Sequence, residues 1–266
     1  MPSAAAVPGD FIVETRGLTK EFSGFTAVRG VNLRVRRGTV HALIGPNGAG
    51  KSTFFNCLTG DLPVTAGTVA FAGRDVTKLP PEARAALGLA RTFQVPLTFE
   101  SMSVLDNATI GALLRHHNAR EARAKARDVL QRVGLGAVID TPARSLGTPG
   151  RKRLEIARAL ASEPKALLLD EAMAGLTPTE VRDAIELVCR IHGGGITIVI
   201  VEHIMEVIVS LAHRVVVFHQ GRDVDSALGI CVVGDGPGRK VIVSCAPNVW
   251  VFHDDDGDLV ADRKEA

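Results

Sequence analysis

The amino-acid sequence predicts an α/β fold in which helices cover a mostly parallel sheet. Apolar segments of strand length recur at Thr39 to Ile44, Ala166 to Leu169, Ile196 to Val201 and Val215 to Phe218. Helical segments separate them, as where apolar residues recur at helical spacing in Val181 to Val188. Strands that alternate with helices form parallel sheets, because each helix carries the chain back to the start of the next strand.

A glycine-rich loop between a strand and a helix supports this fold. The strand Thr39 to Ile44 enters the loop, and Ser52 to Leu58 continues as a predicted helix. The loop completes the pattern G-x-x-x-x-G-K-[ST] with Gly45, Pro46, Asn47, Gly48, Ala49, Gly50, Lys51, Ser52 and Thr53. In a loop of this pattern the backbone N–H groups would point at phosphates, Lys51 would neutralise them and Ser52 would hold Mg²⁺. The sequence therefore predicts a nucleoside triphosphate site.

Composition and length limit the class of protein. The 266 residues are 46% apolar and 23% charged, which is ordinary for a globular chain. The net charge of +2 gives no reason to expect a nucleic-acid partner. Apolar stretches such as Ile196 to Val201 are far shorter than the roughly 20 residues of a membrane span. With no leader pattern at the N-terminus, we expect a cytosolic chain whose four widely spaced cysteines are reduced core residues.

The middle of the chain predicts a helical subdomain over about residues 95 to 162. Ser103 to Asp106 form a plausible capping box, Asn118 can begin an Ala/Arg-rich helix and Gly134 can end it. Thr177 to Glu180 form a second capping box with proline at the first helical position.

Five further elements accompany the strand, loop and helix, one before them in the chain and four after them. An acidic pair, Asp170 and Glu171, ends the buried strand that begins at Ala166, and oxygen ligands of this kind suit a hard cation or a proton acceptor. The remaining elements are Phe22, Gln94, the helix Leu154 to Leu160, and His203 after the strand Ile196 to Val201. Together these elements resemble the ATP-binding cassettes of ABC transporters over about residues 10 to 222.

The resemblance implies a P-loop NTPase core with a mostly parallel sheet, an antiparallel β region and an inserted helical subdomain. It also implies ATP and Mg²⁺ as cofactors. Asp170 would bind Mg²⁺ through water, Glu171 would polarise the attacking water, and Gln94 would touch both metal and water. His203 would contact the γ-phosphate. Phe22 would stack on adenine, with Phe25 as the alternative aromatic.

The loop before the helix Leu154 to Leu160 departs from the family pattern. Leu146 to Gly150, which we name the signature loop, stands where the family usually has Leu-Ser-x-Gly-Gln. Gly147 replaces the serine that contacts the γ-phosphate across the cassette dimer, and Pro149 replaces a glycine whose N–H does likewise. Thr177 stands where an aspartate is common. Losing the serine contact predicts turnover slower by about tenfold to a hundredfold, unless the loop serves only to start a helix.

The amino-acid sequences of the motifs most resemble those of the cassettes of branched-chain amino-acid importers. That resemblance implies a peripheral subunit on the cytoplasmic face of a bacterial inner (plasma) membrane. Its partners would be ABC permease subunits, a second cassette and, indirectly, a substrate-binding protein. The altered signature loop favours a heterodimer, and the segment Val95 to Met102 is the expected permease contact.

Other classes remain as alternatives. A non-hydrolytic regulatory cassette is suggested by Gly147, Pro149 and Thr177, but intact Lys51 and Glu171 oppose it. A soluble ABC factor usually carries two cassettes, and a P-loop kinase needs neither the helix Leu154 to Leu160 nor His203.

Residues 223 to 266 form an atypical C-terminal tail. The segment from residue 221 onward holds five Lys or Arg and nine Asp or Glu residues. Short strands are predicted at Leu228 to Val233, Lys240 to Cys245 and Asn248 to Phe252, around a turn at Asp235 to Gly238.

Overall fold

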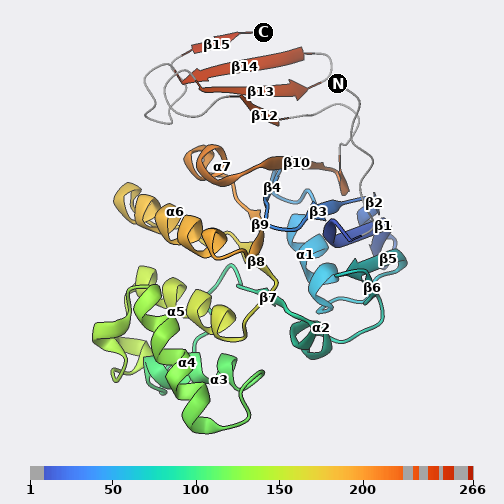
Figure 1. The fold of residues 1–266 in the computed structure, drawn as a ribbon. Coiled ribbons are helices and arrows are strands. Elements are labelled where there is room, and N and C mark those ends of the chain that lie inside the picture. Colours follow the sequence, from blue (N-terminus) through green and yellow to red (C-terminus); the bar gives the residue numbers. More distant parts are fainter. Residues whose placement is uncertain (1–8, 224–229, 234–238, 246–247, 255–262, 266) are drawn as a thin grey trace. The chain divides into compact units, whose positions relative to one another are not determined.

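The computed structural model describes residues 9–223, 230–233, 239–245, 248–254 and 263–265. The chain divides into two compact units (Figure 1). Unit 1 comprises Met1–Lys78 and Val199–Ala266, and unit 2 comprises Leu79–Ile198. Strand β9 (Thr197–Val201), buried along its whole length, contributes residues to both.

Unit 1 contains the expected antiparallel β region. Strand β1 pairs with β2, β3 and β5, and β5 pairs with β6, all antiparallel. These strands are β1 (Phe11–Phe22), β2 (Phe25–Val31), β3 (Arg34–Arg36), β5 (Ala66–Phe71) and β6 (Arg74–Asp75).

The alternating segment from Val31 to Arg36 is less regular than a single strand. Its side chains alternate between buried and exposed, as the period of two predicts, but strand pairing breaks at Asn32 and Leu33. There the Asn32 Oδ1 atom accepts a 2.8 Å hydrogen bond from the Gly17 N–H, and the Leu33 N–H donates to the Thr15 hydroxyl at 2.8 Å. Side-chain acceptors thus replace part of the backbone ladder.

The parallel part of unit 1 leads into the glycine-rich loop. Strand β4 (Val40–Ile44) runs parallel to β10 (Arg214–His219), in register from His41 opposite Arg214 to Ile44 opposite Val217. Helix α1 (Lys51–Thr59) follows the loop. The ring centroid of its Phe54 lies 5.1 Å from the ring centroid of Phe218. Helix α7 (Met205–Leu211) precedes β10, which turns into β11 (Arg222–Asp223).

The predicted strands of the tail form antiparallel pairs. β12 pairs with β10 and β13, β13 with β14, and β14 with β15. Their bounds are β12 (Ile230–Val233), β13 (Arg239–Cys245), β14 (Asn248–Asp254) and β15 (Arg263–Glu265). The predicted turn at residues 235–238 lies outside the described residues, and the proposed boundary near residue 222 stays a prediction.

Unit 2 combines a parallel strand pair with a group of helices. β7 (Leu89–Arg91) runs parallel to β8 (Ala166–Asp170). Figure 1 shows α3, α4 and α5 grouped together. The helices and 3-10 turns are α2 (Pro81–Leu87), α3 (Val104–Ala112), α4 (Ala119–Arg132), η1 (Gly136–Val138), η2 (Ala143–Ser145), α5 (Thr148–Ala161) and α6 (Pro178–Gly193).

The predicted helix caps of unit 2 are confirmed. The Ser103 side chain accepts from the Asp106 N–H, and that of Asn118 accepts from the Arg120 N–H. Thr177 and Glu180 complete a reciprocal capping box at the start of α6. Gly134 takes a left-handed φ of 80° just past α4. Local sequence therefore indicates where these helices begin and end.

The sequence also predicts that the cysteines lie in the core and that no segment spans a membrane. Cys57 is buried as predicted, but Cys189 is exposed on α6, so its placement in the core was wrong. The side chains of Cys231 and Cys245 lie outside the described part of the structure. Within the described parts of the chain, no helix is long and apolar enough to cross a membrane.

The buried His41 of β4 predicts a pH-dependent stability. Burial, aided by the charges of Arg214, His213 and Arg36, lowers the pKa of His41 from 6.5 to about 4. The unfolded chain then binds an extra proton between pH 4 and 6.5, so stability is lost as pH falls through that window. We expect up to about 1.4 kcal/mol of loss per pH unit in urea unfolding. The same series on His41→Leu should lack this contribution, and equal slopes for both chains would contradict it.

Candidate functional site

The glycine-rich loop of unit 1 joins β4 to α1, as predicted. Gly45, Gly48 and Gly50 have φ values of 147°, 79° and 94°, which side chains rarely adopt. A Cβ atom at Gly45 would overlap the Phe218 carbonyl oxygen, and one at Gly50 would overlap that of Ala27. Neighbouring backbone thus fixes both positions as glycine.

Lys51 places a cation inside this loop. Its Nζ atom donates to the carbonyl oxygens of Gly45 at 2.6 Å and Pro46 at 2.9 Å, and the residue is only 8% exposed. Lys51 is also the first residue of α1, where free backbone N–H groups carry partial positive charge. Ammonium group and helix end together suit a phosphate.

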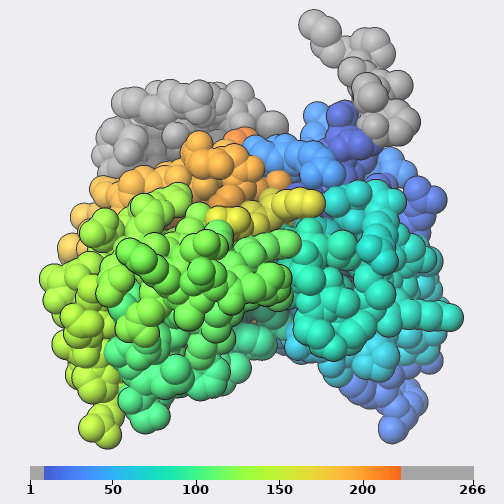
Figure 2. Space-filling view, turned by 60° about the horizontal axis from the view of Figure 1, so that its bottom comes forward, coloured from blue at the N-terminus to red at the C-terminus, as the bar shows by residue number. Residues whose placement is uncertain are grey.

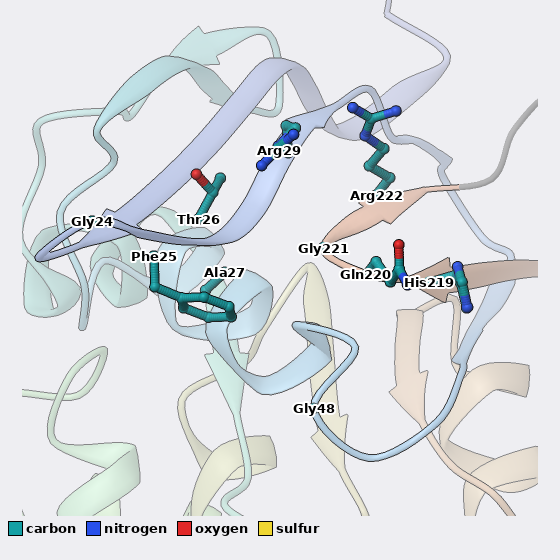
Figure 3. Close-up of a pocket in the computed structure, with 10 residues that line it drawn as sticks. All are labelled: Gly24, Phe25, Thr26, Ala27, Arg29, Gly48, His219, Gln220, Gly221 and Arg222. Atoms are coloured by element: carbon teal, nitrogen blue, oxygen red, sulfur yellow. The ribbon is translucent and has the colours of Figure 1, made fainter.

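A cavity of about 820 Å³ lies beside the loop within unit 1. Figure 3 shows its wall, formed by the β1–β2 hairpin with Phe25, the loop residue Gly48 and the β10–β11 turn. Backbone hydrogen bonds join these parts: Arg29 N–H to Gly221 O at 2.6 Å, and Gly221 N–H to Ala49 O at 3.1 Å.

The two candidate aromatic residues lie opposite each other in the hairpin. Phe22 and Phe25 are register partners across β1 and β2. Phe25 is 65% exposed and lines the cavity, whereas Phe22 is 41% exposed with the Lys20 ammonium 4.9 Å from its ring centroid. The cavity therefore favours the alternative aromatic, Phe25, without testing either role.

His203 lies just past β9, in the part of unit 1 that also holds the end of β4. The backbone N–H of His203 donates to the Glu202 carboxylate at 3.2 Å. The backbone N–H of Glu202 donates to the Leu43 carbonyl oxygen at 3.4 Å. Glu202 is 1% exposed, while His203 is exposed. A buried residue thus anchors the backbone and leaves the imidazole accessible.

In unit 2, the structure brings Gln94 and Glu171 together. The Gln94 Nε2 atom donates to the Glu171 carboxylate at 2.7 Å. The two residues meet because β7 and β8 are parallel and therefore end at the same edge. The ladder continues through Thr92, whose N–H donates to Leu168 O at 2.9 Å and whose hydroxyl accepts from the Asp170 N–H at 3.3 Å.

Asp170 is almost fully buried at the end of β8, with 4% exposure. The Nη2 atom of Arg91 lies 3.3 Å from the Asp170 Oδ2 atom, and both side chains are shielded from solvent. Arg91 is held in turn by the Phe93 ring, whose centroid is 4.3 Å from its guanidinium carbon. No sequence motif had indicated a role for Arg91 itself.

Glu171 has an unusual backbone for a residue with a side chain. Its φ is 46°, in the left-handed region. Its carbonyl oxygen accepts from the Ala174 N–H at 3.1 Å and from the Lys152 Nζ atom at 3.2 Å. These donors stabilise a conformation that costs roughly 1 to 3 kcal/mol.

Sequence reasoning missed Glu155 and Lys152 of α5. The Glu155 Oε1 atom accepts from the N–H groups of Phe93 at 3.1 Å and Leu97 at 3.4 Å, on either side of Gln94. Burial raises the pKa of Glu155, although these N–H groups oppose the rise. The available signal was two charged residues three positions apart on a helix face that otherwise carries apolar residues.

The signature loop starts α5, as predicted. Gly147 is the N-cap, with φ −67° and ψ 174°, and no side chain caps the helix. Pro149 falls in the first turn and lacks an N–H. The first turn therefore offers fewer free N–H groups to an anion than a glycine at this position would allow.

An exposed apolar surface follows Gln94. Val95, Leu97 and Phe99 are 72%, 54% and 48% exposed. Ile110, Leu113 and Leu114 in and after α3 are 37%, 42% and 37% exposed. The Asn107 side chain of α3 bonds both the N–H (2.9 Å) and the carbonyl oxygen (3.0 Å) of Phe99. Figure 2 shows the surface of this helical region in green.

Comparisons with known proteins identify the family. The family model described as ABC transporter matches residues 28–174. BraF of Pseudomonas aeruginosa, a branched-chain amino acid transport ATP-binding protein, is 37% identical and the match covers 79% of this chain and 89% of that protein. LivG of Escherichia coli, with the same description, is 35% identical with the same coverage.

A solved structure gives the same answer for the fold. The ADP conformation of an ATP-binding cassette of an ABC transporter matches with a TM-score of 0.73 and 32% identity, over 80% of this chain and 89% of that one. The chain therefore belongs to the ABC transporter family, as one of its ATP-binding cassettes, a class of ATPase whose hydrolysis is coupled to transport. The predicted fold class and family are both confirmed.

Serine should be tolerated at Gly147. A Cβ atom there meets only Pro149 Cδ, at an ordinary 3.8 Å, and the backbone already has the extended conformation of an N-cap. We expect Gly147→Ser to raise the free energy of unfolding by a few tenths of a kcal/mol, since serine caps helices slightly better than glycine. Gly147→Ala, which adds the Cβ without a hydroxyl, is the control in urea unfolding. A loss above about 1 kcal/mol with serine would show that the loop cannot hold it.

Proposed function

We propose that this cassette is the ATP-hydrolysing subunit of a bacterial importer for branched-chain or related amino acids. The observation that carries hydrolysis is the 2.7 Å contact between Gln94 and Glu171 at the ends of adjacent parallel strands. The substrate class rests on the names of BraF and LivG.

Residues 45 to 53 would bind the phosphates of ATP, with Lys51 as the cation among them. The donor set Ser52 hydroxyl, Gln94 amide oxygen and Asp170 carboxylate suits Mg²⁺, which takes oxygen ligands. Gln94 uses its amide nitrogen on Glu171, which leaves its Oε1 atom as the oxygen that would bind the metal. When bound, Mg²⁺ would neutralise charge on the phosphates.

Glu171 would take the proton of the attacking water, because its carboxylate is already oriented by Gln94. His203, exposed on an anchored backbone, would contact the γ-phosphate. An aromatic of the β1–β2 hairpin would stack on adenine. Phe22 is the choice that the family resemblance supports, and Phe25 is the choice that the cavity supports.

The partners follow from two surfaces. The exposed apolar side chains of Val95, Leu97 and Phe99 suit a membrane subunit, because a monomer rarely leaves such a patch in water. The subunit would thereby be held at the cytoplasmic face of the inner membrane, with a substrate-binding protein acting on the far side. The signature loop would face a second cassette, whose own signature loop would complete this chain's ATP site.

A non-hydrolytic regulatory cassette is the second candidate. Gly147 supplies no serine hydroxyl at the start of α5, and Pro149 supplies no backbone N–H in its first turn. Measured hydrolysis separates the two.

Substitution of Glu171 should separate binding from chemistry. We expect Glu171→Gln to bind MgATP like the parent but to lower kcat by about 10² to 10⁴-fold, the usual contribution of general-base catalysis. Lys51→Ala should instead weaken MgATP binding. Phosphate release by the assembled transporter and binding of a fluorescent ATP analogue measure the two effects.

Glu186→Gln, the same chemical change on the exposed face of α6, serves as the control and should leave both quantities unchanged. Parent-level turnover by Glu171→Gln would remove Glu171 from the reaction. Absence of hydrolysis in the parent complex would support the regulatory alternative.

If the second cassette is a different chain, the two ATP sites of the pair should be unequal. This chain's loop at Lys51 would meet an intact signature, whereas the partner's loop would meet Gly147 and Pro149. We therefore expect Glu171→Gln to remove most turnover of the assembled complex, and the matching change in the partner cassette to remove little. Comparable losses from the two changes would refute the asymmetry.

A further inference from the structure

Helix α5 carries two buried charged residues to which the proposed reaction assigns no role. Lys152 and Glu155 are 7% and 3% exposed. They lie three positions apart and therefore on the same face of the helix. The other buried residues of α5 are apolar, so two charges here need a specific reason.

Glu155 closes a loop around Gln94. One carboxylate oxygen accepts the N–H groups of Phe93 and Leu97, which lie one residue before and three residues after Gln94. No helix or strand includes this segment, so its backbone gains little support from regular structure. Hydrogen bonds to a charged acceptor are about twice as strong as neutral ones. Glu155 thereby fixes the backbone from which the Gln94 side chain reaches Glu171.

Lys152 supports Glu171, the residue that Gln94 contacts. Its ammonium donates to the carbonyl oxygen of Glu171, whose left-handed φ of 46° needs support. One face of α5 thus holds the backbones of both Gln94 and Glu171, whose side chains meet at 2.7 Å.

We propose that Glu155 is a positioning residue for ATP hydrolysis, which holds the segment around Gln94 so that its amide stays on the Glu171 carboxylate. The inference rests on the proposed function, in which Glu171 activates water. Lys152 contributes from the same face by holding the Glu171 backbone.

The position of Glu155 in the helix gives this contact a second consequence. Helix α5 begins at the signature loop, and Glu155 lies seven residues after Thr148, about 10 Å along the axis. The helix therefore connects the signature loop to the residues that hold the Gln94–Glu171 pair. This link lies entirely within unit 2.

Hydrogen exchange tests the contact independently of catalysis. Two variants of the full chain separate loss of the hydrogen-bond acceptor from loss of side-chain volume. Glu155→Gln keeps an acceptor oxygen at this position, and Glu155→Leu fills the space without one. We expect the amides of Phe93 and Leu97 to exchange at least about tenfold faster in Glu155→Leu and within about threefold of the parent in Glu155→Gln. Unchanged exchange in Glu155→Leu would overturn the proposal.

A double-mutant cycle tests whether Glu155 acts through Gln94. In the assembled transporter, Glu155→Leu should lower kcat about tenfold with little change in the KM for MgATP. On a Gln94→Ala background, the same substitution should change kcat by less than about twofold, because the group it positions is gone. The same tenfold loss on both backgrounds would assign Glu155 a purely structural role and refute the proposal.

Arg153→Ala is the matched control, since Arg153 lies in the same turn of α5 but pairs with Asp183 at 3.3 Å. It should leave kcat within about twofold on both backgrounds. If Glu155→Leu fails to fold, Glu155→Gln carries the same cycle with an expected loss of about two- to fivefold. A parent complex that hydrolyses no ATP would overturn the proposed function, whereas an active parent with equal losses would overturn this inference alone.

Discussion

The left-handed backbone of Glu171 is the constraint around which the acidic part of the site is arranged. A residue with a Cβ atom adopts this conformation only when its surroundings compensate the strain. Here the chain leaves a fully buried strand at Asp170 and turns at once, and donors from Ala174 and Lys152 hold the turned carbonyl. The turn directs the carboxylate of Glu171 to the Gln94 amide, while Asp170 stays beside Arg91. Two adjacent carboxylates thus have different surroundings.

The glycine-rich loop of unit 1 is constrained in a different way. Gly45 and Gly50 are required by the nearness of backbone oxygens from Phe218 and Ala27, whereas Gly48 is favoured only by its left-handed φ. The strands β10 and β2, which supply these oxygens, therefore determine the conformation of the loop, although they belong to other parts of the sequence. A loop built this way keeps its N–H groups oriented before a ligand arrives, which lowers the entropy lost on binding.

Most of the fold could be predicted because its signals are local. Strand patterns, the glycine-rich loop and the caps at Ser103, Asn118 and Thr177 depend on residues within a few positions of one another. The contacts of Glu155 and Lys152 could not, because each joins residues 19 or more positions apart, as between Lys152 and Glu171 or Glu155 and Leu97. In the sequence the two charges stand on an otherwise apolar helix face, but nothing there indicates which distant backbone groups they contact. The exposed Cys189 was missed for a similar reason, since apolar character alone does not say which face of α6 it occupies.

The open space at Gly147 bears on how the signature loop came to differ from its family. Packing does not exclude serine there, since only Pro149 lies within reach of an added Cβ. Folding therefore exerts almost no selection between the two residues, and the choice is left to whatever the loop does for the assembled transporter. A lineage could exchange them repeatedly without passing through an unstable intermediate. A change between glycine and serine at this position of the signature loop is thus separable from the stability of the fold.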